Sequence, residues 1–225
     1  MRYIIVTGGP LREAAAGVIK SLSGQKEDVV IIACDGGCDF LASHDIVPDL
    51  AVGDMDSITA DGLAFIDSHD VFTEKYPVEK DWTDSEIALS KTSDGPEDEV
   101  FLISPFEGRF DHTAANIQMV LKFRSGGRRI VMTDGITYGY PLSGEDHVDI
   151  DVSRFEKPLA VSLIPCDFSV PVTGVTTKGL YYPLKDQELS AGSSFSFSNH
   201  PKKKTRRISV SIRSGLLFVT LTFAN

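Results

Sequence analysis

The sequence predicts a mostly parallel α/β domain followed by an antiparallel β-sandwich or barrel, on the basis of three observations. Short apolar runs alternate with segments of helical spacing over residues 1–141. Residues 142–225 carry strand-like runs without a convincing helix. Several of these later runs alternate apolar and polar residues. Alternating strands and helices favour a parallel sheet, whereas closely spaced alternating strands favour a sandwich or barrel.

Apolar runs and helical spacing give the elements of the first domain in order. Val29–Cys34 is a continuous apolar run, which is typical of a strand buried on both faces. Leu11–Leu22 carries apolar residues at helical spacing, which predicts the first helix. The other predicted strands are Tyr3–Thr7, Leu50–Val52, Val71–Lys75, Val100–Ser104 and Arg129–Thr133. The other predicted helices are Cys38–His44, Asp84–Lys91 and Asp111–Phe123.

Alternation defines the strands of the second domain, which we place after a boundary near Pro141–Gly144. Ser194–Ser198 and Ile208–Ile212 alternate serine with apolar residues, which predicts strands with one buried face. The basic run Lys202–Arg207 between them is expected to be an exposed hairpin loop, with contact to nucleotide phosphates or nuclear targeting as alternatives. The predicted strands are Val148–Val152, Leu159–Ile164, Thr173–Thr177, Ser193–Ser198, Ile208–Ile212 and Leu216–Phe223.

Composition excludes several classes of function. The 225 residues carry 22 Lys and Arg against 32 Asp and Glu, a net charge of −10, so we expect no basic face for nucleic acid. An acidic protein that handles a polyanion needs local compensation, for which a divalent cation is the natural candidate. No apolar run approaches the roughly 20 residues that span a bilayer, so no membrane contact is expected. The three cysteines are an odd number and lack the second pair of a zinc site, which indicates a reduced, cytoplasmic protein.

Acidic residues follow two of the predicted strands, at the edge where parallel α/β sheets bind ligands. The glycines of Asp35-Gly36-Gly37 either let backbone N–H groups approach a phosphate or form a tight turn at positive φ. Asp54 and Asp56 follow the next strand and can converge on a hard cation such as Mg²⁺. The alternative for this loop is a helix start, with Asp56 or Ser57 as the N-cap.

Two more motifs belong to the same edge. Lys80-Asp81-Trp82-Thr83-Asp84 sets acids beside a lysine, although Thr83 or Asp84 can also serve as a helix N-cap. Arg109 can bind phosphate oxygens with its forked guanidinium, and Asp111 can cap the next helix or reach a metal. His112 is either a structural hydrogen-bonding residue or an acid–base group. Together the loops predict an acidic pocket for a magnesium–polyphosphate complex, with Lys80 and Arg109 at its rim.

Specific motifs run through both halves in a fixed order. The first half has Ala33–Gly37, Pro48-Asp49, Gly53–Ser57, Lys80–Glu86, and Gly108–His112 followed by Asn116. The second half has Ser162–Pro165, Gly174–Leu184 and Ser196–Asn199. Over nearly its whole length the chain resembles the thiamine pyrophosphokinase family, whose members transfer diphosphate from ATP to thiamine and release AMP. The chain departs from the family at Glu107, where the family often has glycine. It also lacks, in its second half, the tryptophan that the family often has near thiamine, since Trp82 is its only tryptophan. Phe197, Tyr181 or another side chain is expected to supply that aromatic contact.

The resemblance implies a catalytic α/β domain over residues 1–141 and an all-β thiamine-binding domain over residues 142–225. It also implies a homodimer with thiamine at the subunit interface. It implies that Mg²⁺ is bound by Asp54, Asp56 and Asp84, which would act in catalysis with Lys80, Asp81, Arg109 and Asp111. It implies an ATP and diphosphate site formed by Asp35, Gly36, Gly37, Ser57, Thr83, His112 and Asn116. It places Ser196, Ser198 and Asn199 at thiamine.

The implied reaction is an attack of the thiamine hydroxyl on the β-phosphorus of ATP, with Lys80 and Arg109 stabilising charge. Either Asp81 or Asp111 would accept the hydroxyl proton. Three alternatives stay open: a pyrophosphokinase for another alcohol such as a hydroxymethyl pterin, an Asp-x-Asp phosphatase, and a non-catalytic nucleotide-sensing module. The phosphatase type places its acidic pair after the first strand, whereas Asp54 and Asp56 follow a later one.

Overall fold

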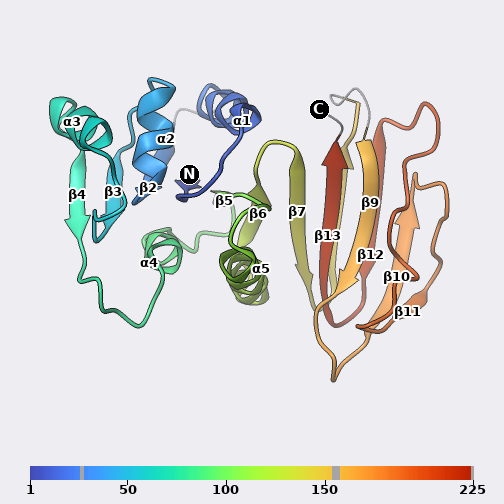
Figure 1. Ribbon diagram of the computed structural model, residues 1–225. Helices are drawn as coiled ribbons and strands as arrows, with labels where there is room; N and C mark the ends of the chain where they lie inside the picture. The colour runs from blue at the N-terminus through green and yellow to red at the C-terminus, as the bar shows by residue number, and fades with distance from the viewer. Residues whose placement is uncertain (26–27, 154–157, 224–225) are drawn as a thin grey trace. The chain divides into compact units, whose positions relative to one another are not determined.

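The chain forms two compact units in this computed structural model, which describes residues 1–25, 28–153 and 158–223. Unit 1 comprises residues 1–119 and 127–135, and unit 2 comprises residues 120–126 and the chain from Ile136 onward. Figure 1 shows the elements of both units along the chain. The sequence predicts a catalytic domain up to residue 141 and a thiamine-binding domain from residue 142. This division by function stays a prediction. Within the described ranges, no helix is long and apolar enough to cross a membrane.

Unit 1 is built on a parallel sheet with the strand order β4-β3-β2-β1-β5-β6. Its strands are β1 (Arg2–Val6), β2 (Val29–Cys34), β3 (Leu50–Gly53), β4 (Phe72–Lys75), β5 (Glu99–Ile103) and β6 (Arg129–Thr133). The chain moves outward from β1 to β4 and then returns to the other side of β1 with β5. The direction of the connections therefore reverses between the adjacent strands β1 and β5. Sheets of this kind bind ligands at such a reversal.

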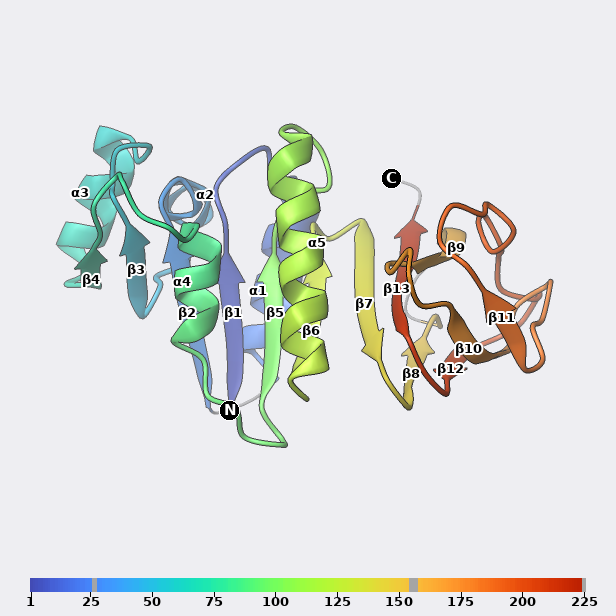
Figure 2. The same cartoon turned by 90° about the horizontal axis from the view of Figure 1, so that it is seen from below.

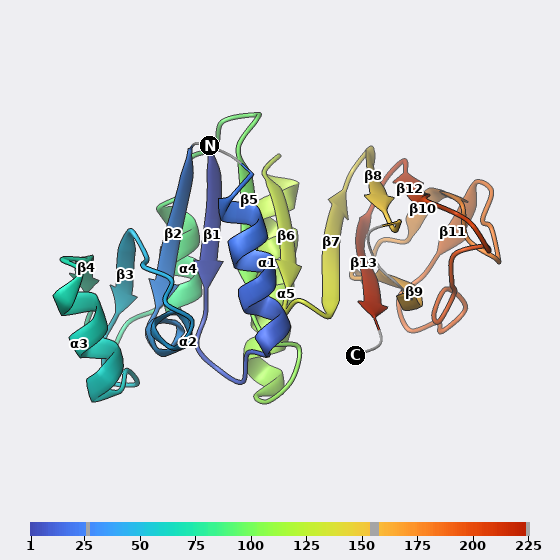
Figure 3. The ribbon, with the colours of Figure 1, turned by 90° about the horizontal axis from the view of Figure 1, so that it is seen from above.

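Helices cover both faces of the parallel sheet, as Figures 2 and 3 show. The helices are α1 (Glu13–Ser23), α2 (Gly37–Ser43), α3 (Ala60–Ser68), α4 (Asp84–Ser90) and α5 (Phe110–Ser125). One face carries α4 and α5, and the other carries α1, α2 and α3. Every residue of β1 is buried because the strand lies between the two helical layers. This layering confirms the α/β class predicted for the first half.

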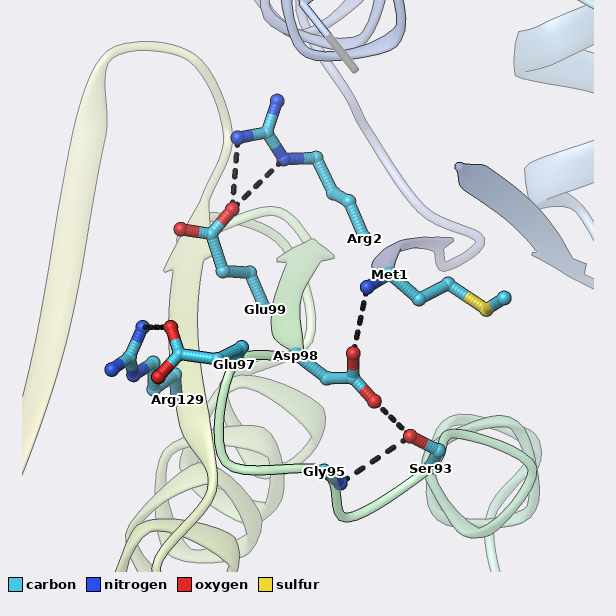
Figure 4. A network of polar contacts seen from close by, with 8 residues as sticks. All are labelled: Met1, Arg2, Ser93, Gly95, Glu97, Asp98, Glu99 and Arg129. Carbon is cyan, nitrogen blue, oxygen red and sulfur yellow. Dashed lines mark hydrogen bonds and ion pairs between the residues drawn. The ribbon is translucent and has the colours of Figure 1, made fainter. Parts of the chain in front are cut away.

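Charged contacts fix the amino ends of the strands, on the edge opposite their carboxyl ends (Figure 4). Nε and Nη2 of Arg2 donate to Oε2 of Glu99 at 3.2 and 2.8 Å. Arg2 and Glu99 lie directly opposite each other in the β1–β5 register. Arg129, at the start of β6, pairs with Glu97 at 3.1 Å. These contacts hold the register of β1, β5 and β6 without occupying the carboxyl edge.

Unit 2 is an antiparallel two-layer structure. One layer has the order β7-β13-β9, and the other has the order β11-β10-β12-β8. Its strands are β7 (Thr137–Ser143), β8 (Asp146–Asp151), β9 (Pro158–Pro165), β10 (Val172–Lys178), β11 (Gln187–Leu189), β12 (Arg207–Ile212) and β13 (Leu216–Phe223). Side chains such as Val161 and Leu217 from one layer and Val175 and Val210 from the other share one core. Two sheets around one core make a sandwich, so the class predicted for the second half is confirmed.

The predicted strand Ser193–Ser198 is wrong. Phe195 and Phe197 are 67% and 43% exposed, whereas Ser196 is buried and donates its hydroxyl to the carbonyl of Leu163 at 2.6 Å. The N–H of Phe197 closes a turn onto Ser194, and Ser198 has a left-handed φ of 57°. The alternation of serine and phenylalanine therefore belongs to an irregular loop. The basic run Lys202–Arg207 is exposed as expected, but it closes no hairpin because the segment before it is not a strand.

Helix α3 and strands β7 and β11 had no counterpart in the prediction. The N-cap of α3 is Thr59, which accepts the N–H of Gly62 at 3.2 Å, so Asp56 and Ser57 are not its caps. Strand β7 contains Gly139 and Pro141, residues that usually interrupt strands. A Cβ on Gly139 would lie 2.1 Å from the ring of Phe218 on β13, so the glycine makes room for that ring.

Candidate functional site

A pocket of about 370 Å³ opens at the carboxyl edge of the parallel sheet, where the strand order reverses. It is lined by Thr7–Pro10, Cys34–Gly36, Ser57, Thr83–Ser85, Ser104-Pro105, Glu107, Arg109, His112, Thr113 and Asn116. These residues follow β1, β2, β3 and β5 or begin α4 and α5, and all belong to unit 1. The predicted residues that line it are Asp35, Gly36, Ser57, Thr83, Asp84, Arg109, His112 and Asn116. The predicted residues outside its lining are Gly37, Asp54, Asp56, Lys80, Asp81 and Asp111.

Close packing shapes the Asp35-Gly36-Gly37 turn. The left-handed φ of 42° falls on Asp35, whereas Gly36 has a right-handed φ of −56° at the start of α2. A Cβ on Gly37 would lie 2.2 Å from the carbonyl oxygen of Val6, so no side chain fits there. A Cβ on Gly36 would lie 3.6 Å from the Cα of Gly8, on the neighbouring loop. The turn is tight, as one alternative predicted, yet Gly37 supplies space rather than positive φ. A Cβ at Gly36 would make only ordinary contact, and Gly36 lines the pocket.

Four carboxyl groups form a connected set around Lys80, and we name Asp35, Asp54, Asp56 and Asp84 the carboxylate cluster. Nζ of Lys80 lies 3.3 Å from Oδ2 of Asp54 and 3.1 Å from Oδ1 of Asp84. The side chain of Asp84 is hydrogen bonded to that of Asp35, and the side chain of Asp54 to that of Asp56. One ammonium neutralises only part of this negative charge. The set is therefore a site for added positive charge.

Backbone contacts fix the loop that follows β3. Oδ1 of Asp35 accepts the N–H of Met55 at 3.1 Å, and Oδ1 of Asp54 accepts the N–H of Asp56 at 3.1 Å. Met55 has a left-handed φ of 67°. A Cβ on Gly53 would lie 1.8 Å from Oδ1 of Asp35, so the position of this carboxyl group requires glycine at residue 53. The loop that carries both acids is thus held at Met55 by Asp35, which directly follows the adjacent strand β2.

The pKa values in the carboxylate cluster reflect how close its carboxyl groups lie to one another. Burial and a hydrogen bond with Asp84 raise the pKa of Asp35 to about 7, against the lowering effect of the Met55 N–H. The Asp56 N–H lowers the pKa of Asp54, while the hydrogen bond and charge of Asp54 raise the pKa of Asp56. Burial works to lower the pKa of Lys80, but contacts with Asp84 and Asp54 outweigh it and raise that pKa. Without a bound cation, Asp35 therefore stays partly protonated near pH 7, where a solvated aspartate is ionised.

The donor chemistry of the cluster suits a hard divalent cation, since Mg²⁺ binds carboxylate oxygens and substrate phosphates. Oδ1 of Asp84 is buried and has no hydrogen bond within the described chain, although Lys80 lies close by. No three His, Cys, Asp or Glu side chains of the described ranges already stand as a metal site. Lys80 bridges Asp54 and Asp84 instead, so a cation between them requires the ammonium to move aside.

The α5 side of the pocket supplies positive charge and hydrogen bonds. Nη2 of Arg109 pairs with Oδ2 of Asp111 at 2.5 Å, and this guanidinium lowers the pKa of Asp111 to about 2. Both side chains are exposed, and of the two only Arg109 lines the pocket. Asn116 is buried and donates through Nδ2 to the hydroxyl of Ser104 at 2.8 Å. The left-handed residue of this loop is Gly108, at φ 85°, so Glu107 needs no glycine-like conformation.

The loop Thr7–Pro10 after β1 is part of the pocket that the sequence prediction missed, together with Ser104-Pro105. Gly8-Gly9 directly after the first predicted strand was the available signal. The loop carries no acid, base or lysine, so nothing in its composition pointed to chemistry. Arg12, just beyond it, forms an ion pair with Glu107 and so ties the β1 loop to the loop before α5.

The residues predicted at thiamine lie in unit 2 and already have structural partners. The buried hydroxyl of Ser196 bonds to Leu163. The side-chain amide of Asn199 donates to the carbonyl of Tyr182 at 2.7 Å and accepts the N–H of Tyr182 at 3.2 Å. Ser198 is exposed, and its N–H donates to the hydroxyl of Ser162. Ser196 and Asn199 therefore shape this loop, while Ser198 presents a free face to solvent; their roles toward a ligand stay predictions.

Two family models match this chain in the order of its two halves. The model described as thiamin pyrophosphokinase, catalytic domain matches residues 23–132, and the model described as thiamin pyrophosphokinase, vitamin B1 binding domain matches residues 147–217. The chain belongs to the thiamine pyrophosphokinase family. The expectation of a thiamine diphosphokinase enzyme is thereby confirmed.

Individual relatives agree with this membership. A thiamine pyrophosphokinase from Bacillus subtilis is 29% identical over 196 residues, which cover 87% of each chain. The crystal structure of thiamine pyrophosphokinase from Bacillus subtilis covers 100% of both chains with a TM-score of 0.81 at 25% identity. The corresponding structure from Geobacillus thermodenitrificans covers 100% of this chain and 99% of its own with a TM-score of 0.78 at 28% identity. The similarity therefore extends through both units of this family member.

Proposed function

We propose that this chain transfers the terminal diphosphate of ATP to the hydroxyl of thiamine, giving thiamine diphosphate and AMP. The observation that carries the proposal is the meeting of an acidic cluster and a pocket at the switch point of the parallel sheet. Asp84 belongs to both, because it lines the pocket and contacts Asp35 and Lys80. Membership of the thiamine pyrophosphokinase family supplies the identity of the acceptor alcohol.

The proposed reaction forms one bond and breaks one bond at the β-phosphorus. The hydroxyl oxygen of thiamine bonds to this phosphorus, and the bond to the α–β bridging oxygen breaks, so AMP leaves with that oxygen. Asp54, Asp56 and Asp84 would hold Mg²⁺, which supplies charge neutralisation for the phosphate oxygens when bound. Two cationic side chains would stabilise the charge on the transferred group and on AMP. They are Arg109 at the pocket rim and Lys80, once its ammonium is released from Asp54 and Asp84.

The proton of the thiamine hydroxyl needs an acceptor, and the prediction left Asp81 and Asp111 open. Arg109 holds the carboxylate of Asp111 and lowers its pKa to about 2, which makes Asp111 a weak base as long as this pair persists. Asp81 is exposed on the loop before α4, between Lys80 and the pocket residue Thr83. We therefore assign the proton-accepting role to Asp81, and to Asp111 the positioning of Arg109.

ATP would occupy the pocket with its phosphates toward the carboxylate cluster. The predicted contacts of Asp35, Gly36, Gly37, Ser57, Thr83, His112 and Asn116 belong to this proposal, although Gly37 lies outside the lining and packs on Val6. The small residues Gly8, Gly9 and Gly36 let the backbone approach a phosphate closely.

A homodimer that binds thiamine at its interface, and a cytoplasmic location, are further parts of the proposal. Exposed aromatic side chains of unit 2 support the interface: Tyr181, Tyr182, Phe195 and Phe197 are 55%, 64%, 67% and 43% exposed. An association surface is usually enriched in such residues. Ser198 lies beside Phe197 and would approach thiamine there with Ser196 and Asn199.

The direct test is incubation of the protein with ATP, Mg²⁺ and thiamine, with separation of the nucleotide and thiamine products. We expect AMP and thiamine diphosphate in equal amounts, and no product without thiamine or in excess chelator. Formation of ADP would contradict diphosphate transfer. Turnover of a hydroxymethyl pterin in place of thiamine would favour the alternative acceptor, and ATP binding without any product would favour a nucleotide sensor.

A further inference from the structure

The loop between β4 and α4 carries the only tryptophan of the chain, Trp82, and leaves it 61% exposed. A tryptophan normally buries a large apolar area. Within the described ranges, no other ring and no cation packs on this indole. Most isolated exposed apolar residues need no explanation. Trp82 differs from such residues because it lies on the loop between Lys80, which contacts the carboxylate cluster, and Thr83, which lines the pocket.

The loop is anchored on both sides of Trp82. At its start the N–H of Tyr76 donates to the carbonyl of Gly53 at 2.8 Å, beside the loop that carries Asp54 and Asp56. Lys80 contacts Asp54 and Asp84, and the hydroxyl of Thr83 caps α4 by accepting the N–H of Glu86. Trp82 is therefore confined between a residue bound to the cluster and a residue that lines the pocket, although it is not itself in the lining.

The proposed reaction determines which part of the two substrates lies near the loop of Trp82, so this step rests on the proposed function. The hydroxyl of thiamine is joined to its cationic thiazolium ring by a short ethyl arm, so that ring must lie close to the reacting phosphorus. The adenine of ATP is separated from the same phosphorus by the ribose and the α-phosphate. A ring on the loop that carries Lys80 and Thr83 is therefore expected to meet the thiazolium and not the adenine.

Charge complementarity supports the same occupant. The face of an indole attracts cations. Glu79 and Asp81, on the same loop as Trp82, are exposed carboxylates that add negative charge around it. A cationic aromatic ring suits both the indole and these acids. We infer that Trp82 is a thiamine-binding residue whose indole packs on the thiazolium ring.

The single tryptophan allows a direct test by intrinsic fluorescence. With Mg²⁺ and AMP present, so that no diphosphate donor is available, titration with thiamine is expected to quench the Trp82 emission with saturation. Free N-acetyltryptophanamide under the same conditions corrects for absorption by thiamine. Quenching by ATP but not by thiamine would overturn the inference, as would emission that changes with protein concentration and is insensitive to thiamine.

Steady-state kinetics give an independent test. We expect Trp82→Ala to raise the KM for thiamine by about tenfold with the KM for ATP unchanged, and Trp82→Phe to restore most of the loss because it keeps an aromatic face. The matched control is Phe72→Ala, which removes another exposed ring of unit 1 from the edge strand β4. Unchanged thiamine kinetics in folded Trp82→Ala would overturn the inference while leaving the proposed function intact. Saturable quenching by thiamine in a wild-type protein without turnover would support the inference and contradict the proposed function.

Discussion

Asp35 is the residue that joins the strand, the adjacent loop and the pocket of the candidate site. It leaves β2 with a left-handed φ of 42°, a conformation that aspartate tolerates better than most residues because its short side chain bonds locally. Its carboxyl group accepts the N–H of Met55 and is hydrogen bonded to Asp84. One side chain thus sets the distance between the acids after β3 and the start of α4.

The raised pKa of Asp35 predicts a pH dependence of stability in the metal-free protein. Because the folded protein holds this proton up to about pH 7 and the unfolded chain releases it near the ordinary value of 3.8, the contribution of Asp35 to stability falls as pH rises through that window. Asp35→Asn, which cannot ionise, is therefore expected to gain stability relative to wild type between pH 4 and pH 8. Urea midpoints in excess chelator measure this, and parallel pH profiles of the two proteins would contradict it.

The prediction on catalysis concerns substitutions of Asp56 and Asp84. We expect Asp56→Asn or Asp84→Asn to lower AMP formation by about a hundredfold or more in a folded protein, because the amide removes charge from the proposed metal site. Thermal unfolding should show that Mg²⁺ with ATP stabilises the wild type more than either variant. Asp67→Asn removes an exposed acid of α3 and serves as the control. Near-normal turnover of folded Asp56→Asn at saturating Mg²⁺ would rule out its assignment as a ligand.

At the scale of elements, the loop after β3 shows how close packing positions the acids. Gly53, the last residue of β3, has φ +146° and faces the carboxyl group of Asp35. The loop then turns through Met55, again at positive φ, before Thr59 caps α3. The geometry of Asp54 and Asp56 is therefore a consequence of how tightly this loop lies on the end of β2.

Gly53→Ala is expected to destabilise the protein by more than about 3 kcal/mol, since the new methyl group meets both backbone strain and the Asp35 carboxyl. Gly127→Ala is the matched control, because Gly127 also has positive φ, at +88°, but has open space around its Cβ position. That control should lose only about 1 kcal/mol. Urea denaturation compares the two, and equal losses would show that the clash with Asp35 contributes nothing.

The strands that the sequence predicts with correct bounds are those with a regular apolar pattern. Val29–Cys34, Arg129–Thr133 and Leu216–Phe223 were predicted with the bounds that the structure has, because continuous apolar or alternating runs report burial directly. The alternation in Ser194–Ser198 wrongly predicted a strand, because its phenylalanines are exposed to solvent and its central serine is buried. Strand β7 was missed since the fit of Gly139 under Phe218 depends on a partner strand that lies far away in the sequence.

At the scale of the whole molecule, the net charge of −10 has a partly local origin. The carboxylate cluster gathers four of the acids around one lysine, so part of the acidity is a property of one site. Bound Mg²⁺ and cationic thiamine would relieve this repulsion. The acidity that argues against nucleic acid thus also favours the proposed ligands.

The cysteines offer a measure of how well the folded molecule excludes solvent. Burial raises the pKa of Cys38 to about 12 and of Cys166 to about 11, and burial with the nearby charges of Asp84 and Asp35 raises that of Cys34. All three are free thiols. At pH 8 we expect the folded protein to react with a disulfide reagent at least about a hundredfold more slowly than after unfolding in urea. Fast reaction of even one thiol in the folded protein would contradict this.

The sequence by itself determined the fold class, the order of most strands and the chemical character of the site. These follow from local patterns, namely apolar periodicity and acids placed at strand ends. Only the tertiary structure decided that Asp35, Asp54, Asp56 and Asp84 connect through Lys80, that Asp111 is held by Arg109 instead, and that Gly8 and Gly9 line the pocket. The physical reason is that side-chain distances and charge compensation depend on how separate strands pack, and no single segment of the sequence contains that information.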